Sequence, residues 1–242
     1  MESYRLEGQT FVIDDYDRKP AFSSFLPGLA GVKGIPLWTF YTNRGQGMNS
    51  FGIDNKGNAI MEFNSANTAF ENTQVKGFRT FLKIDGEYYE PFFTYEKEAK
   101  RQMRMNKNSF KIIETNEKYG IEVTVNYYVL PNESIGALVR QVSVKNIGDS
   151  AKEVQVIDGL PKIITYGIAN GEFKEMSNLF KSWADIRNLE NKVPYYTLRA
   201  STKDSAEVSD VEGGYYYLTV RDGKLQDVIY DVDTVFGYDL SL

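Results

Sequence analysis

The chain has 242 residues, a hydrophobic fraction of 42% and a formal net charge of −5. This length and composition suffice for a sizeable core and exclude wholesale disorder. The negative charge and the lack of a basic block argue against nucleic-acid binding. No stretch approaches the roughly 18 apolar residues of a membrane helix, and no signal-peptide pattern opens the chain, so we expect a soluble, cytoplasmic protein that does not bind membranes.

The sequence contains no cysteine and no histidine. Disulfides, Ser-His-Asp or Cys-His triads and His-ligated metal sites are therefore excluded. Any acid–base chemistry would depend on Asp, Glu, Lys or Tyr, of which the carboxylates are most easily tuned toward neutral pH. We expect no metal and no cofactor.

Short segments rich in aromatic and β-branched residues, separated by turn residues, follow one another along most of the chain. Asp85-Gly86 and Asp222-Gly223 are typical of two-residue hairpins, because both central positions need a positive φ. Strict alternation over 121–129 predicts a strand with one buried face. Segments 137–146 and 153–157 are predicted to pair as a hairpin. The predicted strands are 36–42, 48–53, 59–63, 78–84, 87–93, 121–129, 137–146, 153–157, 195–200, 215–220 and 225–231.

One segment departs from this pattern. Apolar residues recur in steps of three and four from Phe173 to Leu189, which predicts an amphipathic helix at about 172–190 with Trp183 packed on a sheet. Asn191 and Pro194 supply stop signals. Many short strands with one helix predict an all-β sandwich of antiparallel sheets. We expect a single domain over residues 1–242, incomplete at its C-terminal end.

The predicted sugar-binding residues are Tyr41, Asn43, Arg44 and Gln46. Planar amides and a guanidinium can hydrogen-bond sugar hydroxyls, and the neighbouring glycines let a ligand approach closely. The alternative is a hairpin turn in which the glycines supply positive φ and Arg44 pairs with a carboxylate. Tyr41 could stack on a sugar ring. Trp38, three residues earlier in the same predicted strand, should face the opposite side and lie in the core.

Two sets of charged residues have open interpretations. Glu62, Asp158 and Glu172 lie near glycine or proline turns, but acidic residues are so frequent that we expect solvated or salt-bridged side chains rather than catalytic pairs. Segment 97–107 carries five positive charges. It is either a docking surface for an acidic partner or a solvated edge strand.

Several short motifs follow one another along nearly the whole chain. They are Phe22–Gly28, Gly34–Trp38, Phe40–Gln46, Ser50–Gly52, Ile60–Phe63, Phe78–Phe81, Asp158–Pro161, Tyr166-Gly167, Ser182-Trp183 and Gly213-Gly214. In this order they resemble the amino-terminal domain of the cellobiose and β-1,2-oligoglucan phosphorylase family.

This resemblance implies a galactose-mutarotase-like supersandwich, followed in the family by a helical linker and an (α/α) barrel that carries the catalytic Asp. The family reaction is reversible phosphorolysis with inversion. Phosphate is the nucleophile and co-substrate, so one carboxylic acid suffices where an inverting hydrolase needs two. Nothing in this chain matches the barrel or its acid.

The resemblance therefore predicts a non-catalytic domain with a structural and carbohydrate-binding role. Its expected partners are a β-glucan oligosaccharide, the catalytic barrel of the parent or of a partner subunit, and a second copy of the chain in a homodimer. Two alternatives stay open at this point. One is a free-standing carbohydrate-binding module, and the other is a small sugar epimerase or hydrolase that uses carboxylates.

Overall fold

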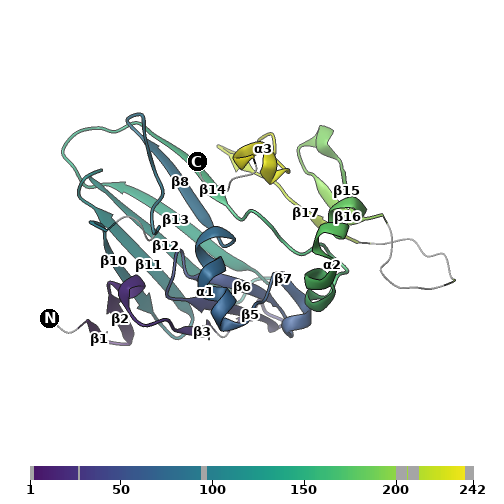
Figure 1. Cartoon of the computed structure of the whole chain (residues 1–242), viewed down its shortest axis with the longest axis horizontal. Helices are drawn as coiled ribbons and strands as arrows, with labels where there is room; N and C mark the ends of the chain where they lie inside the picture. The colour runs from purple at the N-terminus through teal and green to yellow at the C-terminus, as the bar shows by residue number, and fades with distance from the viewer. Residues whose placement is uncertain (1–2, 27, 94–96, 200–205, 207–212, 238–242) are drawn as a thin grey trace. The chain divides into compact units, whose positions relative to one another are not determined.

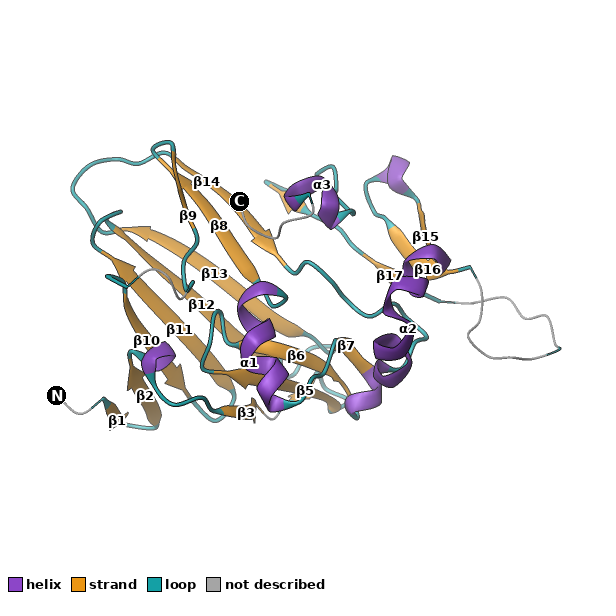
Figure 2. Cartoon of the chain, viewed as in Figure 1, coloured by secondary structure: helices purple, strands orange, loops and turns teal. Residues whose placement is uncertain are grey.

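The computed structural model describes residues 3–26, 28–93, 97–199, 206 and 213–237 (Figure 1). The chain forms two compact units where the sequence led us to expect one domain. Unit 1 comprises Met1–Asn55 and Phe63–Pro161, and unit 2 comprises Lys56–Glu62 and Lys162–Leu242. The described part is mostly β, with antiparallel sheets and few helices (Figure 2). The all-β prediction is confirmed at this level.

Unit 1 contains three sheets and one longer helix. The six-stranded sheet has the order β1 (Tyr4–Glu7), β2 (Thr10–Asp14), β10 (Lys100–Met105), β11 (Ser109–Asn116), β12 (Ile121–Val129) and β13 (Leu138–Asn146). A second sheet includes β3 (Ser23–Leu26), β5 (Ile35–Thr42) and β6 (Met48–Ile53), and β4 (Leu29–Ala30) also pairs with β5. A third has the order β14 (Val154–Gly159), β8 (Arg79–Ile84) and β9 (Glu87–Tyr89). The 3-10 turn η1 (Tyr16–Arg18) and helix α1 (Ala66–Val75) complete the unit, with α1 in contact with β5 and β6.

Unit 2 is built from short strands and turns and from two helices, one of them 14 residues long. These are η2 (Lys56–Asn58), β7 (Ala59–Met61), α2 (Asn170–Trp183), β15 (Ala184–Arg187), η3 (Leu189–Asn191), β16 (Tyr195–Leu198), β17 (Tyr215–Tyr216), β18 (Val220–Arg221), β19 (Lys224–Leu225) and α3 (Val232–Phe236). Strands β15, β16 and β17 form one sheet, and β18 and β19 form a hairpin. Asp222 and Gly223 both have positive φ in that hairpin, as predicted.

The core of unit 1 lies on one face of the six-stranded sheet. The apolar residues of β12 are buried at alternate positions, which confirms the predicted alternation. Residues that are paired across neighbouring strands form rows on the sheet. One row joins Met105, Phe110, Tyr127 and Arg140 from β10 to β13. Side chains from β5, β6, β8 and β9 close the same core from the other side.

The predicted hairpin between 137–146 and 153–157 is wrong. Strand β13 pairs with β12, whereas β14 pairs with β8 in the other sheet. The Asp85-Gly86 turn between β8 and β9 fixes this crossover. The Asp85 N–H donates to the Glu153 carbonyl at 3.0 Å, and the Glu153 N–H donates to Asp85 Oδ1 at 2.9 Å. These contacts hold the start of β14 beside β8, so β14 does not pair with β13.

The predicted helix is present, but it ends earlier than expected. Helix α2 stops at Trp183, and the following residues form β15, which pairs with β16. The Arg199 N–H donates to the Trp183 carbonyl at 2.8 Å, so sheet pairing begins where the helix ends. Trp183 is half-buried, with its ring edge-on to Phe180 at 5.7 Å. The apolar residues after Trp183 keep a helical spacing although they lie outside the helix. The spacing therefore predicted a helix longer than the one observed.

The structure contradicts one of the two interpretations of segment 97–107, the solvated edge strand. Strand β10 lies between β2 and β11, so it is an inner strand of the large sheet rather than a solvated edge. Its Arg101 is buried, and Arg104 forms an ion pair with Glu7 at 2.6 Å. Much of the positive charge is thus used inside unit 1.

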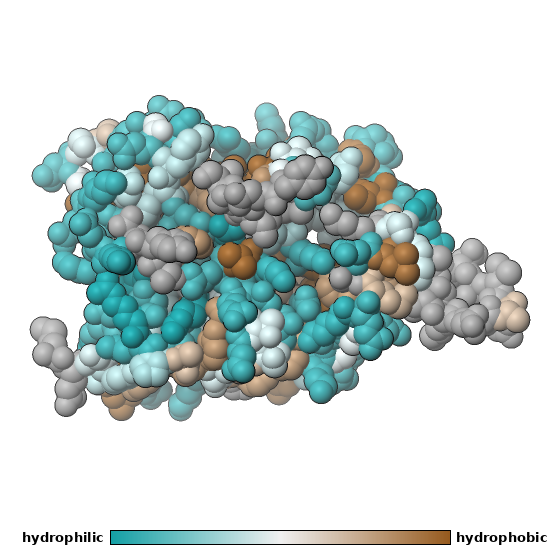
Figure 3. All heavy atoms as spheres, viewed as in Figure 1, coloured by the Kyte–Doolittle hydropathy of each residue, from teal (hydrophilic) through white to brown (hydrophobic). Residues whose placement is uncertain are grey.

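The outer surface is mainly hydrophilic in the view of Figure 3, with separate hydrophobic patches. Among the described residues, none of the helices combines the length and apolar character that crossing a bilayer requires.

Candidate functional site

The turn between β5 and β6 contains the predicted sugar-binding residues. Gly45 and Gly47 have φ values of +49° and +81°, and the Gly47 N–H donates to the Arg44 carbonyl at 2.9 Å. Only glycine adopts such values without strain. The glycines are therefore explained by the turn itself, as the alternative interpretation expected.

Asn43 and Tyr41 lie inside unit 1. The Asn43 side-chain amide donates to the carbonyls of Tyr16 and Pro20 at 2.9 and 3.0 Å, and its Oδ1 accepts from the Phe22 N–H at 2.9 Å. Asn43 is 0% exposed. The Tyr41 ring stacks on that of Phe110, with centroids 4.8 Å apart. Neither side chain is accessible to a sugar, so these two predicted contact residues hold the fold instead.

The relation between Tyr41 and Trp38 also differs from expectation. Tyr41 is buried in the core, whereas Trp38 is only half-buried. The Trp38 ring lies edge-on to Phe63 at 5.7 Å, and its Nε1 donates to the Asn55 carbonyl at 3.1 Å. The core position predicted for Trp38 thus belongs to Tyr41, because β5 turns the Tyr41 face toward the large sheet.

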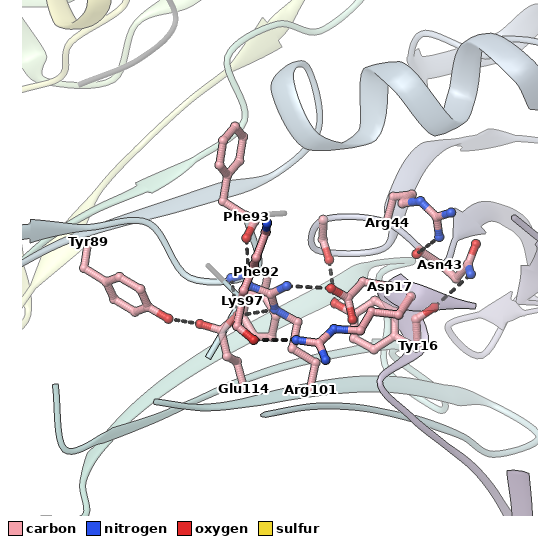
Figure 4. Close-up of polar contacts among 12 residues, drawn as sticks. Tyr16, Asp17, Asn43, Arg44, Tyr89, Phe92, Phe93, Lys97, Arg101 and Glu114 are labelled. Atoms are coloured by element: carbon pink, nitrogen blue, oxygen red, sulfur yellow. Dashed lines mark hydrogen bonds and ion pairs between the residues drawn. The ribbon is translucent and has the colours of Figure 1, made fainter. Parts of the chain in front are cut away.

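Arg44 is half-buried and fits neither predicted environment fully. Its guanidinium donates to the Asn43 carbonyl at 2.8 Å (Figure 4). It also donates to the Lys19 carbonyl at 3.3 Å. Within the described residues it forms no ion pair with a carboxylate. The residue therefore ties the turn to the segment after η1 through backbone acceptors.

Arg44→Ala is expected to lower the free energy of unfolding by about 1 kcal/mol, because two part-buried hydrogen bonds to backbone carbonyls are lost. Arg44→Lys keeps the charge but not the planar fork, and we expect it to recover part of this loss. Urea titration measures both variants. A loss of several kcal/mol for Arg44→Ala would contradict this assignment, since it would indicate an uncompensated buried charge.

Gln46, the fourth predicted residue, belongs to a polar network. Its Nε2 donates to Thr80 Oγ1 at 2.9 Å, and its Oε1 accepts from Arg140 at 2.5 Å. Thr80 donates in turn to Asp158 Oδ1 at 2.5 Å. Both terminal nitrogens of Arg140 donate to the Asp158 carboxylate, and Nη2 lies 2.8 Å from Oδ1. We call these four residues, Gln46, Thr80, Arg140 and Asp158, the Arg140 network.

Aromatic rings hold the arginine of this network in place. The Arg140 guanidinium lies over the Phe78 ring at 4.8 Å, and its Nε donates to the Tyr127 hydroxyl at 3.3 Å. Burial raises the pKa of Tyr127 to about 12, although Arg140 opposes the shift. Burial also opposes the charge of Arg140, but Tyr127 and Asp158 outweigh it and raise the Arg140 pKa. The arginine therefore stays charged and paired.

The Arg140 network has one partly open side. The Asp158 side chain is 30% exposed, against 9% for Arg140. A crevice beside Gln46 is lined by Phe78, Arg79, Glu90 and Phe93, but its volume of about 10 Å³ holds only one water molecule. A sugar could reach Asp158 at the surface but could not enter the crevice.

Two carboxylates near this point do not form a catalytic pair. Arg79 and Thr80 are consecutive in β8 and so point to opposite faces. Glu90 is bound to Arg79 at 2.7 and 2.8 Å, whereas Asp158 is bound to Thr80. Burial raises the pKa of Glu90, although Arg79 opposes the shift. The two acids therefore lie on different faces of β8. In this arrangement they cannot act together on one glycosidic bond.

Two of the three acids singled out in the sequence, Asp158 and Glu172, behave as expected. Asp158 is salt-bridged, and Glu172 accepts from the Ala169 N–H at 3.1 Å at the start of α2. Glu62 is half-buried. Among the described residues, no three acidic side chains gather in a group that could hold a metal ion.

A second charged cluster, which the sequence analysis missed, lies deeper in unit 1 (Figure 4). Arg101 forms ion pairs with Asp17 and Glu114, each at 2.5 Å, and the Tyr89 hydroxyl donates to Glu114. The Phe92 N–H also donates to Glu114, at 2.7 Å. A signal was present, because Glu114 shares its strand face with buried Phe110 and Ile112.

The two charged clusters differ in what they can do. The Arg101 cluster is closed, with the side chains of Arg101, Glu114 and Asp17 only 2%, 1% and 7% exposed. The Arg140 network reaches the surface through Asp158. We therefore take the Arg140 network as the candidate site of unit 1. Comparison with models of known protein families and with curated proteins finds no match to this chain.

Proposed function

We propose that the chain is a non-catalytic domain of a glycoside phosphorylase that acts on β-glucans in the cytoplasm. In this proposal the fold is a galactose-mutarotase-like supersandwich, which packs against a catalytic (α/α) barrel of the same protein or of a partner subunit. The barrel supplies the catalytic Asp and binds phosphate. This chain supplies a packing surface and contacts to the glucan.

The observation that carries this proposal is the convergence of three motifs on the Arg140 network. Gln46 ends the motif Phe40–Gln46, Thr80 lies in Phe78–Phe81, and Asp158 begins Asp158–Pro161. These motifs are far apart in the sequence, yet each contributes one side chain to a single hydrogen-bonded group. Three residues from the motifs that resemble the phosphorylase family therefore lie together in the Arg140 network.

The geometry also favours a non-catalytic role. A phosphorylase needs one carboxylic acid that can donate a proton to the leaving sugar. Asp158 is held by Arg140 and Thr80, and Glu90 is held by Arg79 in a crevice too small for a sugar. The third possibility, a small carboxylate-dependent epimerase or hydrolase, needs two acids beside one substrate, whereas Asp158 and Glu90 are bound to different partners on β8.

We expect the purified chain to release no sugar phosphate from cellobiose or β-1,2-linked oligoglucans in the presence of phosphate. The physical reason is that neither Asp158 nor Glu90 is free to act as a general acid. Chromatographic detection of glucose 1-phosphate measures this. Turnover above background that disappears in Asp158→Asn or Glu90→Gln would overturn the non-catalytic assignment.

A second arm tests the assignment to a phosphorylase directly. A β-glucan phosphorylase barrel, expressed without its own amino-terminal domain, is mixed with the whole chain. We expect the two to co-elute, and phosphorolysis to appear only in the mixture. Failure of the barrel to bind the chain would contradict the proposal and would favour a free-standing carbohydrate-binding module.

A further inference from the structure

Unit 2 carries a concentration of tyrosines that the Arg140 network does not explain. Strands β16 and β17 pair Tyr195 with Tyr216 and Tyr196 with Tyr215. The Tyr217 N–H donates to the Pro194 carbonyl at 3.0 Å, so the pairing continues by one residue beyond β17. Because side chains alternate along a strand, Tyr196, Tyr215 and Tyr217 share one face. Tyr195 and Tyr216 occupy the opposite face.

One further tyrosine joins the first of these faces. The Tyr166 ring meets the Tyr215 ring edge-on, with centroids 5.7 Å apart. We call Tyr166, Tyr196, Tyr215 and Tyr217 the tyrosine face.

The backbone of unit 2 is shaped to hold this face. Gly213 has a φ of +105°, and a Cβ there would lie 2.6 Å from a ring carbon of Tyr166. Glycine is therefore required for Tyr166 to lie against the chain. The Gly213 carbonyl accepts from Thr197 Oγ1 at 3.0 Å, which ties this approach to β16.

Exposure divides the face into anchored and open rings. Tyr196 and Tyr215 are half-buried. Tyr166 and Tyr217 are 45% and 49% exposed. The sheet and the glycine turn therefore hold the open rings in place. Part of each open ring packs within unit 2, and the rest is exposed. A surface of partly fixed rings loses little conformational entropy when it binds a ligand.

We propose that the tyrosine face is a binding site for a neutral oligosaccharide. The C–H faces of pyranose rings are apolar and pack on phenol rings, while each phenol hydroxyl can both donate to and accept from sugar hydroxyls. Tyr215 and Tyr217 repeat along the strand at about 7 Å, so the two rings can contact neighbouring parts of one oligosaccharide. The choice of a β-glucan as the ligand rests on the proposed function.

The test is isothermal titration of the whole chain with cellohexaose, a β-1,2-linked glucohexaose and maltohexaose. We expect a β-linked hexaose to bind, and Tyr166→Ala and Tyr217→Ala each to weaken binding by about tenfold or more. Tyr217→Phe keeps the ring and should retain most of the affinity. Circular dichroism checks that each variant is folded.

Tyr216→Ala is the matched control. Tyr216 is 69% exposed and lies in the same strand but on the opposite face. We expect it to leave the affinity within about twofold. An equal loss for Tyr216→Ala and Tyr217→Ala would overturn the proposal, because it would show no preference for the tyrosine face.

Other outcomes separate this inference from the proposed function. Binding of maltohexaose alone, lost in Tyr217→Ala, would support the face as a sugar site and contradict the β-glucan assignment. Phosphorolysis in the mixture with a barrel, without binding of any hexaose by the chain, would overturn the face and support the proposed function. A change of oligomeric state in Tyr217→Ala, with no sugar binding, would overturn the proposal in favour of a protein interface.

Discussion

Arg101→Met is expected to lower the free energy of unfolding by about 3–5 kcal/mol. The Arg101 side chain is 2% exposed and donates to Asp17, Glu114 and the Phe93 carbonyl at 2.5, 2.5 and 2.7 Å. Methionine fills a similar volume and leaves little cavity, so the loss comes mainly from electrostatics. Two carboxylates would stay buried without their counter-ion.

The loss should also depend on pH, and its sign follows from Glu114. Burial already raises the pKa of Glu114, although Arg101 and the hydrogen bond from Tyr89 oppose this. Removing Arg101 raises it further above the value in the unfolded chain. A group whose folded pKa is raised binds its proton more tightly in the folded state, so stability falls as pH rises. The variant should therefore be more severely destabilised at pH 7 than at pH 5.

Lys100→Met is the matched control, one residue away in the same strand. Lys100 pairs with Glu117 at 2.6 Å, but both side chains are 74% exposed. Such an exposed pair contributes little to stability. Urea titrations at the two pH values compare the variants. Equal losses for Arg101→Met and Lys100→Met would mean that the cluster is solvated and not part of the core.

The elements that the sequence predicted well are those that local interactions determine. Strand β12 alternates because one face packs on the core, and each alternate residue must be apolar. The Asp85-Gly86 and Asp222-Gly223 hairpins depend on positive φ at two adjacent residues, a requirement that only a few residue types meet. In each case a few neighbouring residues carry the whole signal.

The errors arose where distant residues decide. Strand β14 pairs with β8 because Glu153 is bound at the Asp85 turn, which lies far away in the sequence. Helix α1 was missed because its residues are mostly polar, and it is held instead by tertiary contacts, such as Thr73 with Thr42 at 3.0 Å. Segment 97–107 looks solvated by its charge. Its Arg101 is nevertheless buried, because partners from η1 and β11 neutralise it.

The sequence predicted only part of the candidate site, for a related reason. Gln46 was identified from its turn and Thr80 lies in the motif Phe78–Phe81, but Arg140 lies in none of the motifs and carries no local sign of function. Asn43 shows the converse error, because an amide that hydrogen-bonds four backbone groups has the same chemistry as one that binds a sugar. Residue type shows that a hydrogen bond is possible, and only the fold shows which partner takes it.

Gly47→Ala is expected to cost about 3 kcal/mol or more, because two separate penalties add. Gly47 has a φ of +81°, which is strained for alanine, and its Cβ would lie 2.3 Å from the Phe110 ring. That ring cannot easily move aside. Phe110 is 0% exposed and stacked between Tyr41 at 4.8 Å and Tyr127 at 5.6 Å. Tyr127 also accepts a hydrogen bond from Arg140, so a shift would extend into the Arg140 network.

Gly34→Ala separates the two penalties. Gly34 has a φ of +63°, but nothing lies within 4 Å of a Cβ at that position. Its replacement should therefore cost only the backbone penalty of about 1–2 kcal/mol. Urea titration of both variants gives the difference, which we assign to overlap with Phe110. If Gly47→Ala costs no more than Gly34→Ala, the stacked rings can shift. The core beneath the β5–β6 turn would then be looser than the contacts around Phe110 indicate.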